Sequence, residues 1–194
     1  MPRGEYAYKK ALALASGSDS KARRSEVLEL LERSSSMGNA RALYALGTWY
    51  WYGVATKRNR RHALKLFEDS ARRGNHDAQM WLGIAFERGT STKKDAKKAF
   101  AMYMKAAKGG ALDGQLEVAR CLYYGIGTKQ SPAKSVGWYR RAARRGDAEA
   151  QYSLGRMYEV GDSVRRNRGV AKHWYAKAAA QGDEHAAKAV ADLS

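Results

Sequence analysis

Small and apolar residues recur along this chain with a fixed period of 36 positions. Gly38, Gly74, Gly110 and Gly146 each open one copy of the repeat. Counted from that glycine, position 9 is leucine or valine, position 10 is glycine or alanine, and position 16 is always glycine. A fixed period of this length is typical of stacked supersecondary units and not of a closed globule. The pattern therefore predicts an all-α solenoid.

Within each copy, the apolar positions have the spacing of helices. The glycine at position 16 is expected to end the first helix, because a left-handed backbone is least costly for glycine. The second helix should begin after a residue type that favours N-caps, with Pro132 at the first helical position of one copy. Those cap residues are Asn59, Asp95, Ser131 and Asn167. Each copy is thus predicted as a helix–loop–helix hairpin, and the array as a right-handed α–α superhelix.

The period divides the chain into a cap, four full copies and a terminal helix. Residues 1–37 are predicted as a divergent hairpin cap, with helices from Glu5 to Ala15 and from Lys21 to Ser34 and a break over residues 16–20. Residues 182–194 are predicted as a short capping helix. The four full copies are 38–73, 74–109, 110–145 and 146–181.

The clearest copies read G-[DN]-x-x-A-x-x-x-L-G-x-x-Y-x-x-G, followed by A-x-x-W-Y-x-K-A-A. This pattern resembles the Sel-one-like repeat, a subfamily of tetratricopeptide-like helical solenoids, over residues 38–193. The third copy departs from it at Gly114, Ala119 and Leu122. The resemblance implies an adaptor that presents a concave surface to other proteins. Bacterial members look like signalling, envelope-regulation or host-interaction scaffolds, and eukaryotic ones like parts of quality-control complexes.

One face of each first helix is expected to line a shared groove. Helical geometry places positions 4, 7, 11, 14 and 15 opposite the packed side. They carry many Tyr, Trp, Met and Arg residues, the types that concentrate binding energy at interfaces. The alternative for any one aromatic ring is that it folds back onto the next unit. The predicted groove residues are Arg41, Tyr44, Trp51, Tyr52, Met80, Ile84, Arg88, Arg120, Tyr123, Tyr124, Tyr152 and Arg156.

The formal net charge of +17 favours an acidic partner. The loops and second helices of the four copies carry +20 in total, whereas the first helices carry −3. The excess is therefore expected on the convex side and loop edge, where lysines also serve solubility. Cations just before a helix N-terminus are disfavoured by the helix dipole. Binding of an anionic partner would explain why cations recur there. This basic edge is Lys57, Arg58, Arg60, Arg61, Lys93, Lys94, Arg165, Arg166 and Arg168.

The sequence offers no catalytic or metal-binding constellation. The four histidines are scattered without a second ligand at metal spacing, and Cys121 falls on the packed face. We therefore expect no enzyme, no cofactor, no metal and no small-molecule substrate. A single cysteine excludes an internal disulfide, and no run reaches the ~20 apolar residues of a membrane span. A cytoplasmic protein is expected, with a removed signal peptide left open.

The expected function is a protein–protein interaction scaffold. Its groove would bind a partner segment, and its basic edge would meet an acidic surface of that partner; a bacterial adaptor, an immunity protein or an effector-binding protein would fit. Nucleic-acid binding along the basic edge is the alternative, although its clusters lack the interleaved aromatic residues that stack on bases. Attachment to an anionic membrane surface is a third interpretation.

Overall fold

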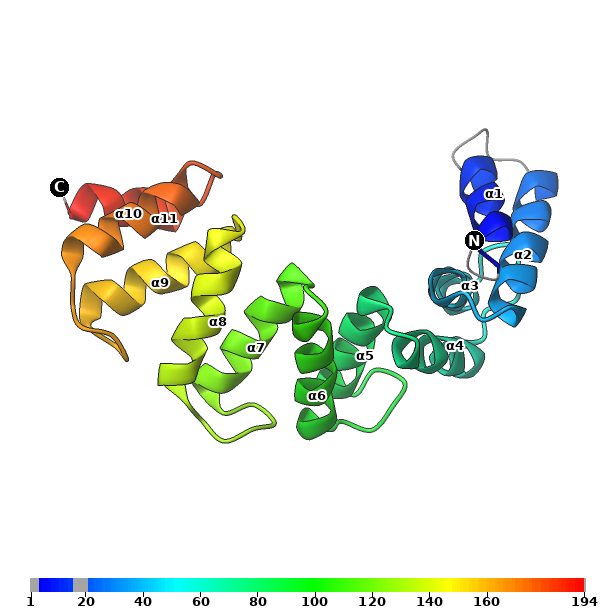
Figure 1. The fold of residues 1–194 in the computed structure, drawn as a ribbon, viewed down its shortest axis with the longest axis horizontal. Coiled ribbons are helices and arrows are strands. Elements are labelled where there is room, and N and C mark those ends of the chain that lie inside the picture. The colour runs from blue at the N-terminus through cyan, green and yellow to red at the C-terminus, as the bar shows by residue number, and fades with distance from the viewer. Residues whose placement is uncertain (1–3, 16–20, 194) are drawn as a thin grey trace. The chain divides into compact units, whose positions relative to one another are not determined.

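A computed structural model describes residues 4–15 and 21–193 of the chain, which form eleven α-helices and no strand. The predicted break over residues 16–20 lies outside the described residues. The chain divides into two compact units, Met1–Lys94 with α1–α5 and Asp95–Ser194 with α6–α11 (Figure 1). The helices are α1 (Glu5–Ala15), α2 (Lys21–Ser36), α3 (Ala40–Tyr52), α4 (Arg60–Arg72), α5 (His76–Arg88), α6 (Ala96–Lys108), α7 (Leu112–Tyr124), α8 (Pro132–Arg144), α9 (Ala148–Val160), α10 (Arg168–Ala179) and α11 (Glu184–Asp192).

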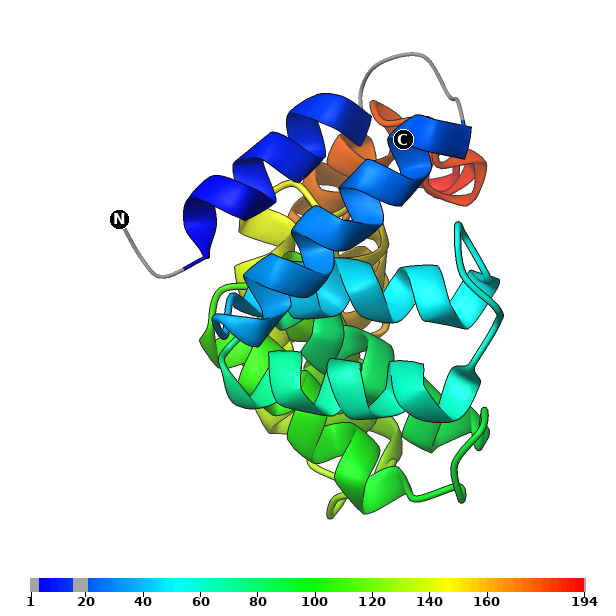
Figure 2. The same cartoon turned by 90° about the vertical axis from the view of Figure 1, so that its right-hand side faces the viewer.

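Successive helices pack on one another within each unit. In Met1–Lys94, α1 packs on α2, α2 on α3, α3 on α4 and α4 on α5 (Figure 2). In Asp95–Ser194, the same neighbour-to-neighbour packing runs from α6 to α11. The all-α repeat fold predicted from the period is therefore confirmed. Among the described residues, no helix combines the length and apolar character that crossing a bilayer requires.

Local hydrogen bonds set most helix ends where the sequence places them. Asn and Asp side chains accept a hydrogen bond from a backbone N–H three residues on, as Asp147 does from Ala150 at 2.7 Å. Ser131 stands at the cap position of α8 but makes no side-chain capping bond, so its predicted role is only positional. The position 16 glycines end all four first helices in the left-handed conformation, with φ of 75–82°.

The small residue at position 10 lets an aromatic ring of the second helix approach the first helix. A Cβ added at Gly47 would lie 2.7 Å from Phe67 Cε1, and one at Gly155 would lie 2.5 Å from Tyr175 Cδ1. Both rings are fully buried. The ring at position 30 of the second helix thus fills the gap beside this glycine, because α4 and α10 cross directly over the glycines.

Buried glutamines connect successive hairpins. The side-chain amide of Gln79 donates to Ala71 O, and that of Gln151 donates to Ala143 O, each at a distance of 3.0 Å. Both acceptors are carbonyls in the last turn of the preceding second helix. These bonds satisfy carbonyls that a helix end leaves without an intrahelical partner. Gln79 and Gln151 thereby fix how the hairpins join at these two junctions.

Candidate functional site

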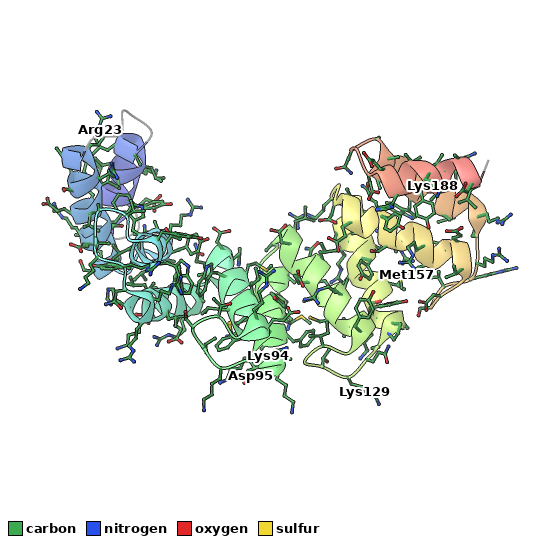
Figure 3. The ribbon with its side chains drawn as sticks, turned by 180° about the vertical axis from the view of Figure 1, so that it is seen from behind. Arg23, Lys94, Asp95, Lys129, Met157 and Lys188 are labelled. Atoms are coloured by element: carbon green, nitrogen blue, oxygen red, sulfur yellow. The ribbon has the colours of Figure 1, made fainter. Side chains whose placement is uncertain are left out.

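The first helices of the second unit converge on a pocket of about 200 Å³. Its walls come from the C-terminal end of α7, the middle of α8, one face of α9 and the loop after α9. Figure 3 marks the place of this pocket through Met157, which lies on α9. We call it the tyrosine pocket, and its lining residues are Tyr123, Tyr124, Tyr139, Tyr152, Ser153, Arg156, Met157, Val160 and Asp162.

Two adjacent tyrosines at the end of α7 form one wall of the tyrosine pocket. The Tyr123 hydroxyl donates to Asp162 Oδ2 in the loop after α9, and this bond raises the pKa of Tyr123. The Tyr123 and Tyr124 rings meet edge to face with centroids 4.8 Å apart. Tyr124 is 64% exposed. The hydrogen bond to Asp162 therefore fixes one ring, which in turn orients an exposed one.

The floor of the pocket is Tyr139, which is buried and belongs to the second helix of its repeat. Burial raises the pKa of Tyr139 to about 12, with a smaller contribution from the charge of Glu149. The phenol therefore stays neutral at physiological pH. The repeat pattern did not identify Tyr139 as a pocket residue, because its contribution depends on where α9 crosses α8.

The opposite wall holds a basic group without a carboxylate partner. The Tyr175 hydroxyl donates to Glu159 Oε2 at 2.7 Å, and the Tyr152 and Tyr175 rings lie 5.5 Å apart. Within the described part of the chain, Arg156 makes no ion pair, and the carboxylates of Asp162 and Glu159 each accept a tyrosine hydroxyl. Arg156 is exposed and offers its donors to a ligand in the pocket.

Charged side chains lie on the neighbouring part of α7 and at the start of α9. Arg120 Nε and Nη2 each lie 2.7 Å from Glu117 Oε2. Burial raises the pKa of Glu149, and the charges of Asp147 and Glu117 add to the effect while Arg120 opposes it. Charges of both signs therefore lie on α7 and α9.

In the first unit, the predicted groove residues differ in their exposure. Tyr52 is 71% exposed at the end of α3, and Arg41, Ile84 and Arg88 are also exposed. Tyr44 is half-buried against Phe67, and burial raises its pKa. Met80 is likewise half-buried.

The prediction that Trp51 is exposed in the groove is wrong. Trp51 is only 8% exposed and packs edge to face on Trp81 of α5, with centroids 4.5 Å apart. Its ring also lies 6.4 Å from Phe67, and the Arg60 guanidinium lies 5.0 Å from the centroid. Trp51 therefore holds two hairpins together and is not available to a partner.

The basic edge is exposed throughout: all nine of its predicted side chains face solvent. Figure 3 shows Lys94 and Lys129 extending from the loops between helices. In the second unit the loop after α9 forms a hollow beside α8, which we call the arginine cleft. Its lining residues are Arg140, Tyr158, Val164, Arg165, Arg166 and Asn167. The third copy contributes no equally dense cluster, because Lys129 is followed there by Gln130, Ser131 and Pro132.

The repeat signature, now placed on helices, can be compared with known proteins. The Sel1 repeat family matches residues 40–75, 76–110, 112–147 and 148–183, which is most of the chain. The chain belongs to the Sel1 repeat family. No curated protein sequence is similar enough to count as a relative.

Solved structures share the Sel1 fold with this chain. A protective antigen of uropathogenic Escherichia coli, c5321, superposes with a TM-score of 0.90 at 24% identity over 99% of this chain. This chain covers 41% of c5321, less than half of its length. A Sel1 repeat protein from Oxalobacter formigenes gives a TM-score of 0.82 at 25% identity, covering 95% of this chain and 76% of that one. The immunity protein PA5088 of Pseudomonas aeruginosa gives a TM-score of 0.57 at 24% identity, and the match covers 96% of this chain and 68% of that one.

Proposed function

We propose that this Sel1 repeat protein is a non-enzymatic scaffold that binds a segment of a partner protein along the inner face of its first helices. The observation that carries the proposal is the tyrosine pocket. Its exposed Tyr124 ring is held by a neighbour that is itself fixed through a carboxylate. Rigid aromatic anchors of this kind bury large contact area at little entropic cost.

The chemistry of the pocket indicates what it would accept. Arg156 lines the pocket without an ion pair among the described residues, whereas Asp162 and Glu159 each accept a tyrosine hydroxyl. The pocket therefore offers donors and aromatic surface, which suit an apolar side chain flanked by a carbonyl or carboxylate. At about 200 Å³ it accommodates one side chain and not a drug-sized ligand. The exposed basic edge would then meet an acidic surface of the same partner.

The comparisons support a protein-facing role. Two of the similar structures are described as immunity proteins of Pseudomonas aeruginosa, and another as a protective antigen. A bacterial adaptor, or an immunity or effector-binding protein, is consistent with these neighbours. Nucleic acid binding along the basic edge stays the competing function, and a steep loss of affinity with added salt would identify it.

The decisive experiment is affinity purification from the source cell with quantitative mass spectrometry, followed by calorimetry with the recovered partner. Tyr124→Ala combined with Arg156→Ala should weaken that partner at least about 10-fold, since interface anchors of this type contribute more than ~1 kcal/mol each. Tyr6→Ala is the matched control, because Tyr6 is 75% exposed on α1 and outside the pocket. Retention of full affinity by the double variant would rule the tyrosine pocket out as the docking site.

A further inference from the structure

The arginine cleft lies on the side of α9 opposite the tyrosine pocket. Successive residues of a helix are rotated by about 100°, which puts Tyr158 across the helix from Tyr152, Arg156 and Val160. The two hollows share no lining residue. The arginine cleft is also the larger, at about 550 Å³. It is therefore a separate candidate site, formed by the same two repeats, 110–145 and 146–181.

Backbone and side-chain hydrogen bonds hold the walls of the arginine cleft in place. Arg140 Nη2 donates to the Tyr158 hydroxyl at 3.0 Å, and Arg166 Nε donates to Glu159 O at 2.9 Å. Asn167 N donates to Tyr158 O at 2.8 Å. The bonds from Arg140 and Arg166 each use one guanidinium nitrogen, and the remaining donors of those planar groups stay available.

No carboxylate lines the arginine cleft among the described residues. The two acidic side chains of the adjoining segment are engaged elsewhere, Glu159 by Tyr175 and Asp162 by Tyr123 and Ser163. The loop thus directs its acidic group towards the tyrosine pocket and its arginines towards the arginine cleft.

The position of these cations is unfavourable without an anion. Arg165 and Arg166 directly precede Asn167, the N-cap of α10, and the first turn of α10 contains no acidic residue. The N-terminal end of a helix carries a partial positive charge, so cations there are destabilising. An anion within the cleft would neutralise both the guanidinium groups and the helix end.

We propose that the arginine cleft binds a phosphate group carried by a side chain of a partner protein. A phosphate offers three acceptor oxygens and close to two negative charges, and guanidinium groups bind it through paired hydrogen bonds. A carboxylate offers two oxygens and one charge, so it matches the three arginines that line the cleft less well than a phosphate does. A nucleic acid would need a row of phosphate sites and exposed rings for stacking, whereas this cleft is one hollow whose single ring is half-buried. This proposal rests on the proposed function in one respect: that the phosphate belongs to a partner protein.

The test is a titration of the ¹⁵N-labelled full chain with N-acetyl-phosphoserine methylamide, followed by amide chemical shifts. We expect saturable shifts around Arg165, Arg166 and Asn167 with a dissociation constant on the order of 1 mM. Arg165→Gln with Arg166→Gln should weaken binding at least about 10-fold. Arg165→Gln alone serves as a second variant, since Arg165 makes no hydrogen bond in the described structure. Arg144→Gln with Lys188→Gln removes the same charge from exposed positions outside the cleft and should change little.

Three results would overturn the phosphate assignment. One is equal weakening in the control pair, which would show general charge attraction. Another is equally tight binding of N-acetyl-aspartate methylamide, which would show that a carboxylate suffices. The third is displacement of the probe by a generic DNA duplex at micromolar concentration, which would assign the cleft to nucleic acid. None of these readouts depends on Tyr124 or Arg156, so failure here leaves the tyrosine pocket to be judged by its own experiment.

Discussion

Two glycines inside helices of the second unit provide a sharp test of how the hairpins pack. Gly155 in α9 faces the buried Tyr175 ring, and an added Cβ would lie 2.5, 2.6 and 2.9 Å from three of its carbons. Gly137 in α8 is also in a helix interior, but an added Cβ would meet nothing within 4 Å. Glycine to alanine at both sites therefore makes the same chemical change in opposite surroundings.

The expected magnitudes follow from two competing effects. Alanine in a helix interior is more favourable than glycine by about 0.8–1 kcal/mol. At Gly137 this gain is unopposed, so Gly137→Ala should raise the free energy of unfolding by up to about 1 kcal/mol. At Gly155 the ring must retreat by about 1 Å, and overpacking of this kind costs about 1–3 kcal/mol. The retreat also strains the 2.7 Å bond from Tyr175 to Glu159, so Gly155→Ala should be destabilising by about 1–2 kcal/mol.

The measurement is urea unfolding followed by circular dichroism, with thermal midpoints as a second readout. The two variants should differ by about 2–3 kcal/mol, or roughly 5–10 °C in midpoint for a chain of this size. The wild-type protein should fall between them. If Gly155→Ala were as stable as Gly137→Ala, the close approach of Tyr175 to α9 and the packing scheme built on it would be refuted.

Three further predictions address local structure and titration. Gly127→Ala should lower the free energy of unfolding by about 2–3 kcal/mol in urea, because its Cβ would lie 1.9 Å from Ala96 O; a neutral result would contradict that contact. Asp147→Ala should be destabilising by about 1 kcal/mol in thermal unfolding, whereas Ser131→Ala should have a much smaller effect, since only the aspartate makes a capping bond; equal losses would reject this reading of the caps. Because burial raises the pKa of Tyr139 to about 12, its neutral form contributes stability that is complete below pH 10 and is lost as pH rises towards 12. Unfolding followed across this range should show a shallower decline for Tyr139→Phe than for the wild type, and identical pH profiles would count against the buried phenol.

Backbone conformation in the loops illustrates what the sequence leaves open. Position 18 of every copy is left-handed, with φ of 53° at Ala55, 59° at Ser91 and Ser163, and 67° at Gly127. Only one of the four residues is the glycine that this conformation favours. The shared loop geometry overrides the local preference in the other three copies, so residue type alone predicts the conformation only at Gly127.

The candidate site was predicted in part. Tyr124 and Arg156, both among the predicted groove residues, are exposed and line the same pocket. Tyr52, at the equivalent position of the first full copy, is exposed as well. Trp51, which is equivalent to Tyr123, is buried instead, because Trp81 of the next hairpin packs against it. Tyr139 and Asp162 were missed because their roles depend on contacts between separate helices and loops. Whether the predicted groove residues bind a partner stays a prediction.

The sequence by itself determined the features that neighbouring residues along the chain produce. These are the 36-residue period, the two helices of each copy, the aspartate and asparagine caps and the left-handed glycines that end the first helices. Each depends on hydrogen bonds or backbone preferences within a few residues. Tertiary structure alone decided which rings are buried and which tyrosines surround a pocket. It also decided that no carboxylate lines the arginine cleft among the described residues. Those outcomes depend on distances between side chains of different helices, and repeat positions that are equivalent in sequence meet different neighbours in each copy.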